Sequence, residues 1–509
     1  MGSTPFTSSP TPLPSASKEE AAAHLVPTNP SVLGFAFPSW KKWAILTSVF
    51  IVQLSMNFNA AIYSTAIPGL TTQFGITENL AEIGQMVFLI TYAFGCELWA
   101  PWSEELGRKW VMQGSLALVN VWQVPCALAP NFGTLVAFRA LGGLSSAGGS
   151  VTLGMVADMW RADEQQYAVA FVVLSSVAGS VIAPVAGGYI GTYLSWHWVF
   201  WISLIFGVVA QTIHLFVPET RSSVMLDHYA QRLRKTGEDP TAYGPNEIRG
   251  SFWQRISWKE SCTLMWRPYK MLYSEPIVGF LSLLSGFSDA LIFTGLDSYG
   301  LVMAKWNFTR IQVGLSFIPL LLGYLIAYVS FMVVYWRDRR VMRAGKPYPP
   351  ERRLWWLLFT VLLEPIGLFI YGWASLGPPQ FPWWVPQICA ALIGIANFAI
   401  YMATVDYMIA AYGEYSASAT GGNGFCRDFL AGIAAVYARR MFTQIDPGTK
   451  WTLPIPSFIL CGVGILLCIP VYIFYFKGAW FRERSPFAKE LENERAMAEQ
   501  EGSLPAGGE

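Results

Sequence analysis

Acidic side chains interrupt several long apolar stretches of this sequence, and the chemistry they offer is proton binding in an apolar setting. Glu97, Asp289 and Glu364 are carboxylic acids of this kind. A charge at bilayer depth costs roughly 2.5–3.5 kcal/mol or more, so such groups usually face a cavity or a partner. A carboxylic acid there can take up and release a proton, which makes the three residues candidates for proton coupling. In the alternative, Glu97 only hydrogen-bonds a neighbouring helix, and Glu364 satisfies backbone groups that Pro365 frees.

A compact group of charges stands between two further apolar stretches, in APWSEELGRKW at residues 100–110. Gly107 permits the tight turn that so short a connection needs. We expect Arg108 to pair with Asp158, which lies in VADMW near the end of another apolar stretch. Such a pair could form when this side of the protein closes and break when it opens, adding to a balance of a few kcal/mol between two states. In the alternative, the charges only fix the orientation of the chain in a membrane.

The elements that hold these residues are predicted to be membrane-spanning helices. The chain has 509 residues, of which 53% are hydrophobic and 13% charged, whereas soluble domains carry roughly 25% charged residues. A helix needs about 20 mostly apolar residues to cross a bilayer. The sequence therefore predicts an all-α polytopic membrane protein with twelve transmembrane helices, at 43–67, 83–103, 111–130, 133–156, 168–193, 198–217, 275–299, 311–336, 354–376, 382–410, 416–438 and 454–476.

A hydrophilic segment divides these spans six and six. The first residues are rich in Ser, Thr and Pro, a composition that cannot bury a core. The first span then serves as an uncleaved signal anchor. The expected organisation is a disordered N-terminal tail over 1–40, a six-helix bundle over 41–217, a central loop over 218–274, a second six-helix bundle over 275–476 and a C-terminal tail over 477–509.

Basic residues fix the predicted orientation, because Lys and Arg concentrate on the cytoplasmic side of membrane proteins. With the N-terminus inside, 24 Lys and Arg residues fall in the cytoplasmic segments and five in the outer ones. Both termini are therefore predicted to be cytoplasmic, and we expect a multi-pass protein of the plasma membrane. Asn307 begins the sequon NFT in the outer loop between spans 7 and 8, which makes it a glycosylation candidate.

Several motifs, in the expected order, resemble the major facilitator superfamily, and specifically its fungal drug:H+ antiporter branch with twelve spans. The short turn resembles G-x-x-x-D-x-x-G-R-R, with Glu104 at the acidic position and Lys109 at the second Arg. LVAFRALGGLSSAGG places Arg139 at the intramembrane Arg of span 4. GSVIAPVAGGY resembles the antiporter pattern of span 5, and PETR (218–221) the exit of span 6. SWHWVFWI (195–202), PERRL (350–354), PIGLF (365–369) and NGFCRDF (423–429) add to the likeness.

The resemblance implies roles for particular residues. Arg139 would take part in proton coupling, although by itself it could equally cap facing carbonyl groups. Glu104 would tie the turn to neighbouring helix ends, as part of a gate with Gly107, Arg108 and Asp158. The antiporter motif, which implies a bias toward export, comprises Gly179, Pro184, Gly187 and Gly188. Small residues at these positions also let helices pack closely, which is the structural alternative.

The cavity of such a fold lies near the membrane midplane, between the two bundles. Asn59 and Tyr63 share one face of span 1 at i, i+4 spacing. Polar and aromatic residues of spans 10 and 11 complete the set. The substrate-cavity candidates are Asn59, Tyr63, Tyr401, Asn423 and Arg427.

The predicted function is secondary active transport by alternating access, as proton-coupled export of a small organic molecule such as a drug, toxin or secondary metabolite. An organic-acid, polyamine or other metabolite carrier on the same fold is the alternative. A non-transporting receptor is a weaker one, since the segment after the last span is short. The intramembrane Arg residues suit an anion and the acids suit a cation or proton, so the sequence leaves the substrate charge open.

Other classes of protein find little support in the sequence. The seven Cys form no CxxC pair and the four His are scattered, so we expect no metal site and no cofactor. No nucleophile elbow or phosphate loop occurs, which argues against an enzyme. A net charge of +1 gives no sign of a nucleic-acid partner. The expected partners are the lipid bilayer, a small-molecule substrate and protons, and we expect a monomer.

Overall fold

Helices are the regular elements of this protein throughout the part of the chain that the structure describes. The computed structural model describes residues 32–161, 164–249, 258–344, 348–487 and 489. Within these ranges there is no strand. The predicted N-terminal tail lies mostly outside them, and its described part contains a short 3-10 helix, η1 (Gly34–Ala36).

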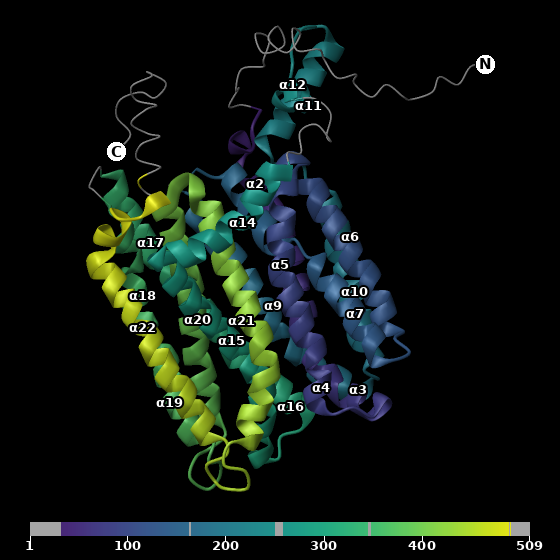
Figure 1. Ribbon diagram of the computed structural model, residues 1–509, viewed down its shortest axis with the longest axis vertical. Coiled ribbons are helices and arrows are strands. Elements are labelled where there is room, and N and C mark those ends of the chain that lie inside the picture. Colours follow the sequence, from purple (N-terminus) through teal and green to yellow (C-terminus); the bar gives the residue numbers. More distant parts are fainter. Residues whose placement is uncertain (1–31, 162–163, 250–257, 345–347, 488, 490–509) are drawn as a thin grey trace, which may run out of the picture.

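Six helical segments form the N-terminal half (Figure 1). Three of them change character along their length, because a turn of 3-10 helix or a break separates their parts. In chain order the half comprises α2 (Ser39–Ala61) with η2 (Ile62–Ala66) and α3 (Ile67–Phe74), α4 (Glu78–Ala81) with α5 (Ile83–Glu105), α6 (Arg108–Ala127), α7 (Phe132–Leu144) with α8 (Gly148–Met159), α9 (Gln165–Tyr193) and α10 (His197–Leu215).

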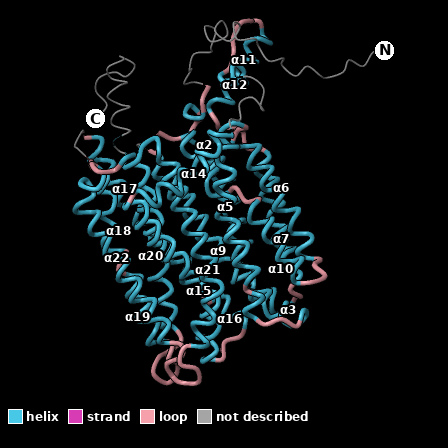
Figure 2. The backbone as a smooth tube through the Cα atoms, viewed as in Figure 1, coloured by secondary structure: helices cyan, strands magenta, loops and turns pink. Residues whose placement is uncertain are grey.

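Six further segments form the C-terminal half and pack beside the first six (Figure 2). They comprise α15 (Pro276–Met303) with η3 (Ala304–Trp306), α16 (Arg310–Leu315) with α17 (Ile318–Arg343), η4 (Pro350–Leu354) with α18 (Trp355–Thr360) and α19 (Leu363–Ala374), α20 (Trp384–Tyr412), η5 (Gly413–Tyr415) with α21 (Ser416–Gln444), and α22 (Pro454–Arg482).

Each of the twelve predicted spans coincides with one of these segments, so the predicted all-α membrane fold is confirmed. Among the described residues, nine helices are long and apolar enough to cross a membrane by composition alone. Of the other three segments, α6 and α21 carry more polar residues, whereas the break between α7 and α8 leaves two apolar helices of 13 and 12 residues, each too short to span alone. Several helices are longer than predicted: α17 continues to Arg343 and α22 to Arg482, because a helix can extend past the apolar layer into a charged surface.

Three helices of the segment between the two halves lie at one end of the bundle. These are α11 (Ser222–Thr236), α12 (Pro245–Arg249) and α14 (Trp258–Ser274), and the start of α2 and the end of α22 lie at the same end (Figure 1). We call this the central-loop end and the opposite one the far end. The ring of Tyr269 on α14 lies 4.9 Å from Phe425 of α21 and 6.3 Å from Phe94 of α5. Helix α14 therefore contacts both halves.

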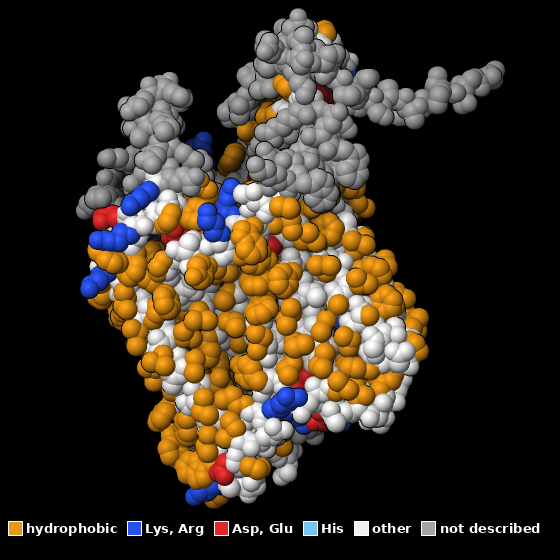
Figure 3. Space-filling model, in the orientation of Figure 1, with side chains coloured by type: hydrophobic (Ala, Val, Ile, Leu, Met, Phe, Trp, Pro, Cys, Tyr) orange, Lys and Arg blue, Asp and Glu red, His pale blue; other side chains and the backbone are white. Residues whose placement is uncertain are grey.

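The surface of the bundle fits a lipid environment. In the face shown in Figure 3, hydrophobic side chains cover the middle of the molecule and Lys and Arg side chains gather near the central-loop end. Large apolar residues such as Ile326, Val333 and Leu466 are more than half exposed on the membrane-spanning helices. In lipid such exposure is favourable, because the surrounding chains are as apolar as the side chains.

The fourth segment is broken in the middle, between α7 and α8. The break leaves backbone groups of Ser145 and Ala147 without helical partners, and Ser115 of α6 satisfies both. Its hydroxyl donates to the Ser145 carbonyl at 2.7 Å and accepts from the Ala147 amide at 2.9 Å. Such a break is tolerated within a membrane only where other protein groups supply the missing hydrogen bonds.

The two halves touch through their backbones at the far end, where α9 meets α16. A Cβ placed on Gly314 would lie 2.6 Å from the carbonyl oxygen of Pro184, and one on Gly188 would lie 2.8 Å from that of Arg310. The Arg310 guanidinium also donates to the Gly191 carbonyl at 2.7 Å. Glycine at 188 and 314 thus allows backbone-to-backbone contact between the halves.

The remaining glycines of the span-5 motif pack within the N-terminal half instead. A Cβ on Gly179 would meet the Leu54 carbonyl at 2.7 Å, and one on Gly187 would meet the Thr65 side chain at 2.1 Å. Helix α9 therefore uses Gly179 and Gly187 to pack on the first segment and Gly188 to reach the other half. This division explains why the motif needs several glycines on more than one face.

Substituting Gly188 by Ala should weaken the far-end contact. The new methyl group would press on backbone, which cannot rotate away, so we expect a loss of about 1–3 kcal/mol of stability. The matched control is Gly191→Ala, because a Cβ at Gly191 meets nothing within 4 Å. Thermal unfolding of the purified variants would measure the difference, and equal melting temperatures for the two would contradict it.

Candidate functional site

A cavity of about 200 Å³ lies between the two halves, toward the central-loop end. It is bounded by α2, α5, α8 and α9 on one side and by α20 and α21 on the other. The wall combines apolar and aromatic surface with a few polar groups, as small-molecule sites do. Its charged and polar lining residues include Gln53, Asn57, Tyr92, Glu97, Glu104, Arg108, Gln165, Tyr401, Thr420, Arg427 and Asp428.

Three carboxylic acids line this cavity; Glu104 lies beside Arg108, and the other two face the cavity from opposite halves. Glu97 of α5 is 5% exposed, and Asp428 of α21 is half-buried. Within the described residues neither forms an ion pair. Gly421 makes room for Glu97, because a Cβ there would lie 2.8 Å from its carboxylate oxygen. These are the two acids without an ion pair that a proton or a cationic group in the cavity would meet.

The cationic groups of the cavity wall, in contrast, have anionic partners. Arg427 donates from Nη2 to the Oδ1 of Asp289 on α15 at 3.1 Å. Its guanidinium also stacks over the ring of Tyr401, 3.4 Å from the ring centroid. Asp289, a predicted proton-coupling residue, is therefore held in an ion pair behind the wall. The charge of Arg427 is balanced before any substrate arrives.

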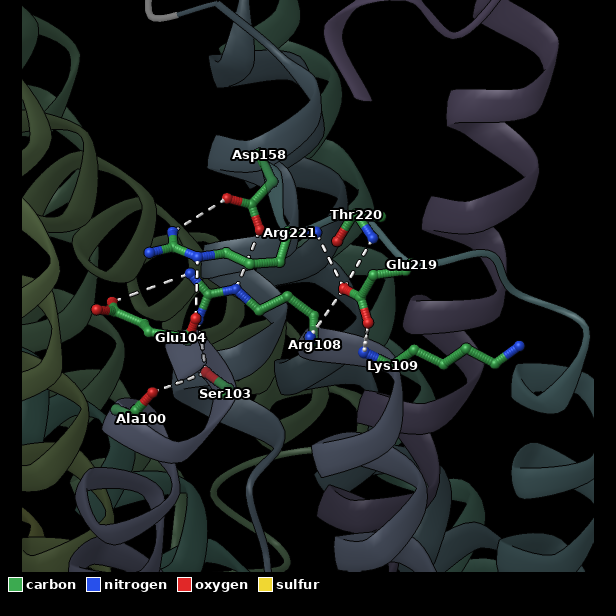
Figure 4. A network of polar contacts seen from close by, with 9 residues as sticks. All are labelled: Ala100, Ser103, Glu104, Arg108, Lys109, Asp158, Glu219, Thr220 and Arg221. Carbon is green, nitrogen blue, oxygen red and sulfur yellow. Dashed lines mark hydrogen bonds and ion pairs between the residues drawn. The ribbon is translucent and has the colours of Figure 1, made fainter. Parts of the chain in front are cut away.

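Arg108 is likewise bound in a network at the central-loop end (Figure 4). Its Nε donates to the Oδ2 of Asp158 on α8 at 3.0 Å, which confirms the predicted pairing. Its Nη1 donates to the Ser103 hydroxyl, and Glu104 lies 4.0 Å from its Nη2. Arg221 approaches the other oxygen of Asp158 at 3.7 Å. The charged turn between α5 and α6 thus closes onto α8.

The sequence of this chain is similar to those of known transporters. A sequence model of the Major Facilitator Superfamily matches residues 49–436. The MFS-type transporter paaT of Penicillium rubens is 30% identical over 476 residues, covering 92% of this chain and 84% of that protein. The efflux pump FUBT of Fusarium oxysporum is 27% identical over 474 residues, covering 90% and 76%. The chain belongs to the major facilitator superfamily.

A solved structure agrees at the level of the fold. The xylose transporter XylE of E. coli, in an inward-open conformation, is 16% identical and superposes with a TM-score of 0.57, over 85% of this chain and 96% of that one. The family match and the relatives named as transporters identify the present chain as a multi-pass secondary transporter of this superfamily, and not an enzyme. The cavity between its halves is the candidate substrate site.

Glu219 is a residue of this transporter that the sequence motifs did not single out. Its carboxylate accepts hydrogen bonds from the backbone amides of Arg108 at 2.9 Å and Lys109 at 3.3 Å, the first two residues of α6. It also accepts from the amides of Thr220 and Arg221, each at 2.9 Å. A carboxylate at a helix N-terminus satisfies free amides and opposes the helix dipole. The PETR motif could have pointed to Glu219, because this acid stands directly after span 6.

Two glycines make this network possible. Gly107 has φ +95°, and a Cβ there would collide with the Glu219 carboxylate at 2.4 Å. Gly154 of α8 leaves space for the Arg108 guanidinium, whose Cζ a Cβ would approach to 2.6 Å. The members of the network belong to the N-terminal half or, for Glu219, Thr220 and Arg221, to the segment directly after it, and none lies in the C-terminal half. The predicted gate of Glu104, Gly107, Arg108 and Asp158 therefore stays a prediction, and it must act through a partner on the other half.

The C-terminal half has a corresponding pair at the same end. Arg353 of η4 binds Asp406 near the end of α20, as Arg108 at the start of α6 binds Asp158 near the end of α8. Parallel repeats of this superfamily produce such related positions. Asp406 also links the two halves, because Gln166 of α9 donates to it at 2.6 Å. Glu164 adds an ion pair with Arg339 of α17.

Arg139 lies outside the cavity wall. It is 1% exposed, and its guanidinium donates to the carbonyls of Gly84 and Asn59, each at 3.3 Å. It lies between two rings, 4.0 Å from the centroid of Phe88 and 4.7 Å from that of Tyr63. This geometry matches the alternative in which Arg139 caps facing carbonyls. Among the described residues Arg139 has no acidic partner, and its part in proton coupling stays a prediction.

The other candidates divide between the cavity and the helix interfaces. Tyr401 and Arg427 line the cavity, whereas Asn59, Tyr63 and Asn423 do not. The Asn59 amide contacts Arg139, and the Tyr63 hydroxyl donates to the Ala81 carbonyl at 2.8 Å. Asn423 is fully buried and reaches Ser282 and Ser285 of α15. In this conformation these three residues therefore hold helices together.

Glu364, predicted to couple protons, also lies in an interface. It is 1% exposed and accepts from the Ser288 hydroxyl, which accepts in turn from the Asn397 amide at 3.1 Å. Asn307 differs from all of these, since it is exposed at the far end with φ +57°. Thr309 of its sequon caps α16. Glycosylation of Asn307 stays a prediction.

Neutralising one partner of the Arg108–Asp158 pair should destabilise the transporter. Asp158→Asn leaves a buried guanidinium with only Glu104, at 4.0 Å, as an anionic neighbour, and breaking a buried pair typically costs about 3–5 kcal/mol. Lys109→Gln is the matched control, because the contact of Lys109 with Glu219 uses only its backbone amide. Thermal unfolding would compare the two, and a melting temperature of Asp158→Asn equal to that of the control would contradict the expectation.

Proposed function

We propose that this transporter exports a small organic molecule in exchange for protons, by alternating access. The observation that carries the proposal is the imbalance of charge in the cavity. Arg108 and Arg427 are held by Asp158 and Asp289, while Glu97 and Asp428 face the cavity without an ion-pair partner among the described residues. A carboxylic acid in such a place can exchange its proton for a cationic group, which links the two movements.

The arrangement of the halves supports the alternating-access part of the proposal. Backbone contacts between α9 and α16 close the far end, and the cavity lies toward the central-loop end. With the central-loop end in the cytoplasm of a plasma-membrane protein, this is an inward-facing state. The proton would then enter from outside onto a buried carboxylic acid, favour this state and leave toward the cytoplasm as substrate moves outward.

The names of relatives agree with export. FUBT is called an efflux pump, and its alignment covers nine-tenths of this chain. On the side of the substrate, the free carboxylic acids favour an organic cation over an anion. A polyamine or another metabolite carrier is therefore the second candidate, and an organic-acid carrier would need Arg427 to leave Asp289.

Glu97→Gln should uncouple transport from the pH gradient. In proteoliposomes, ethidium would serve as the organic cation and its movement would be followed with and without a gradient. The gradient should accelerate ethidium movement by the wild-type protein. The variant should support only the exchange of ethidium inside the vesicles for ethidium outside. Glu238→Gln, at an exposed acid of the segment between the two halves, is the matched control. Unchanged gradient-driven movement in both Glu97→Gln and Asp428→Asn would rule out these acids as coupling groups.

Asp289→Asn should change selectivity rather than coupling. It removes the anionic partner of Arg427 and leaves a cation free to face the cavity, so binding of an organic anion should improve. We expect exchange of benzoate relative to ethidium to rise about tenfold, which corresponds to ~1.4 kcal/mol. Arg427→Lys, which keeps a positive charge beside Asp289, should not shift the ratio. An unaltered ratio in Asp289→Asn would contradict the neutralised-cavity interpretation.

A further inference from the structure

At the far end, a second group of acids lies in the interface between the halves and is separate from the cavity. Its central member is Glu82, at the junction of α4 and α5. Glu82 is 1% exposed, and both of its carboxylate oxygens are buried without a hydrogen-bond partner among the described residues. Carboxylic acids this deeply buried usually have a partner, and an ionised one without any is very costly.

Charged groups on three neighbouring elements lie close enough to Glu82 to act on its charge. Glu78 comes from α4, Asp297 from α15, and Arg439 and Arg440 from α21. Arg439 is already in an ion pair with Glu78, and Arg440 is exposed. Asp297 has no ion pair among the described residues. The nearest cation is therefore shared with another acid, and the remaining neighbour of Glu82 is an acid on the opposite half.

The two acids belong to halves that must separate when the far end opens. Helix α21 packs closely on α5 just inside this point, where a Cβ on Gly432 would lie 3.2 Å from the Met86 carbonyl oxygen. If Glu82 and Asp297 are both ionised, their repulsion and the loss of hydration act against this contact. If a proton is held there, the contact is neutral and the halves can close.

We propose that Glu82, with Asp297 opposite, is a proton-binding site that controls closure of the far end. Protonation stabilises the closed state seen here, and ionisation favours opening. Acid on the far side therefore holds the cavity open toward the central-loop end. The inference uses the alternating-access part of the proposed function but is independent of the substrate and of the coupling role of Glu97.

Distances across the far end test the proposal directly. Spin labels at Thr72 of α3 and Lys450 of the loop before α22 would report opening, since both positions are exposed and belong to different halves. The exposed Cys262 would be replaced by Ser beforehand. In detergent without substrate, a longer-distance population should grow as the pH rises. Because no transport is measured, a failure of proton-driven export would leave this result readable.

Glu82→Gln should lose this pH dependence and keep the short distance throughout, because Gln resembles the protonated acid. Glu82→Asp should retain the dependence, since it keeps an ionisable group. Glu78→Gln is the matched control: it removes a neighbouring acid and the ion pair with Arg439, and it should still respond to pH. Asp297→Asn should reduce the response. A pH-independent distance in the wild type, or an unchanged response in Glu82→Gln, would overturn the proposal.

Discussion

The interior of a bilayer offers no hydrogen-bonding solvent, so each polar group that this chain buries must find its partner in the protein. That constraint explains most of the architecture. Ser115 repairs the break between α7 and α8, Glu219 covers the start of α6, and Arg139 collects carbonyls between two aromatic rings. Three acids that have no ion-pair partner among the described residues, Glu82, Glu97 and Asp428, lie in the interface between the halves or in the cavity.

The fold could be predicted from the sequence because its main signal is local. Each span declares itself by a run of apolar residues, and basic residues gather in the connections at one end. Even the pairing of Arg108 with Asp158 followed from short motifs, since both stand at predictable helix ends. The lengths of α17 and α22 were underestimated, because hydropathy marks the edge of the lipid and a helix does not have to stop there.

The wiring of the site depended on contacts between distant segments. Asp289 and Arg427 lie 138 positions apart, and no local pattern shows that each neutralises the other. Asn59 and Asn423 likewise could not be placed from local patterns. Their polarity suggested a cavity wall, but their side chains bond to neighbouring helices. Glu82 was passed over since it precedes its apolar run, and only the packing of α21 and α15 against that point buries it.

The aromatic contact made by α14 has a mechanical consequence. Tyr269 touches Phe425 and Phe94, so the segment that joins the two halves is also pressed against both of them. Contacts of this kind limit how far the two halves can move relative to one another. A motion that separates α5 from α21 at this end must first break these ring contacts. Helix α14 therefore opposes opening of the central-loop end.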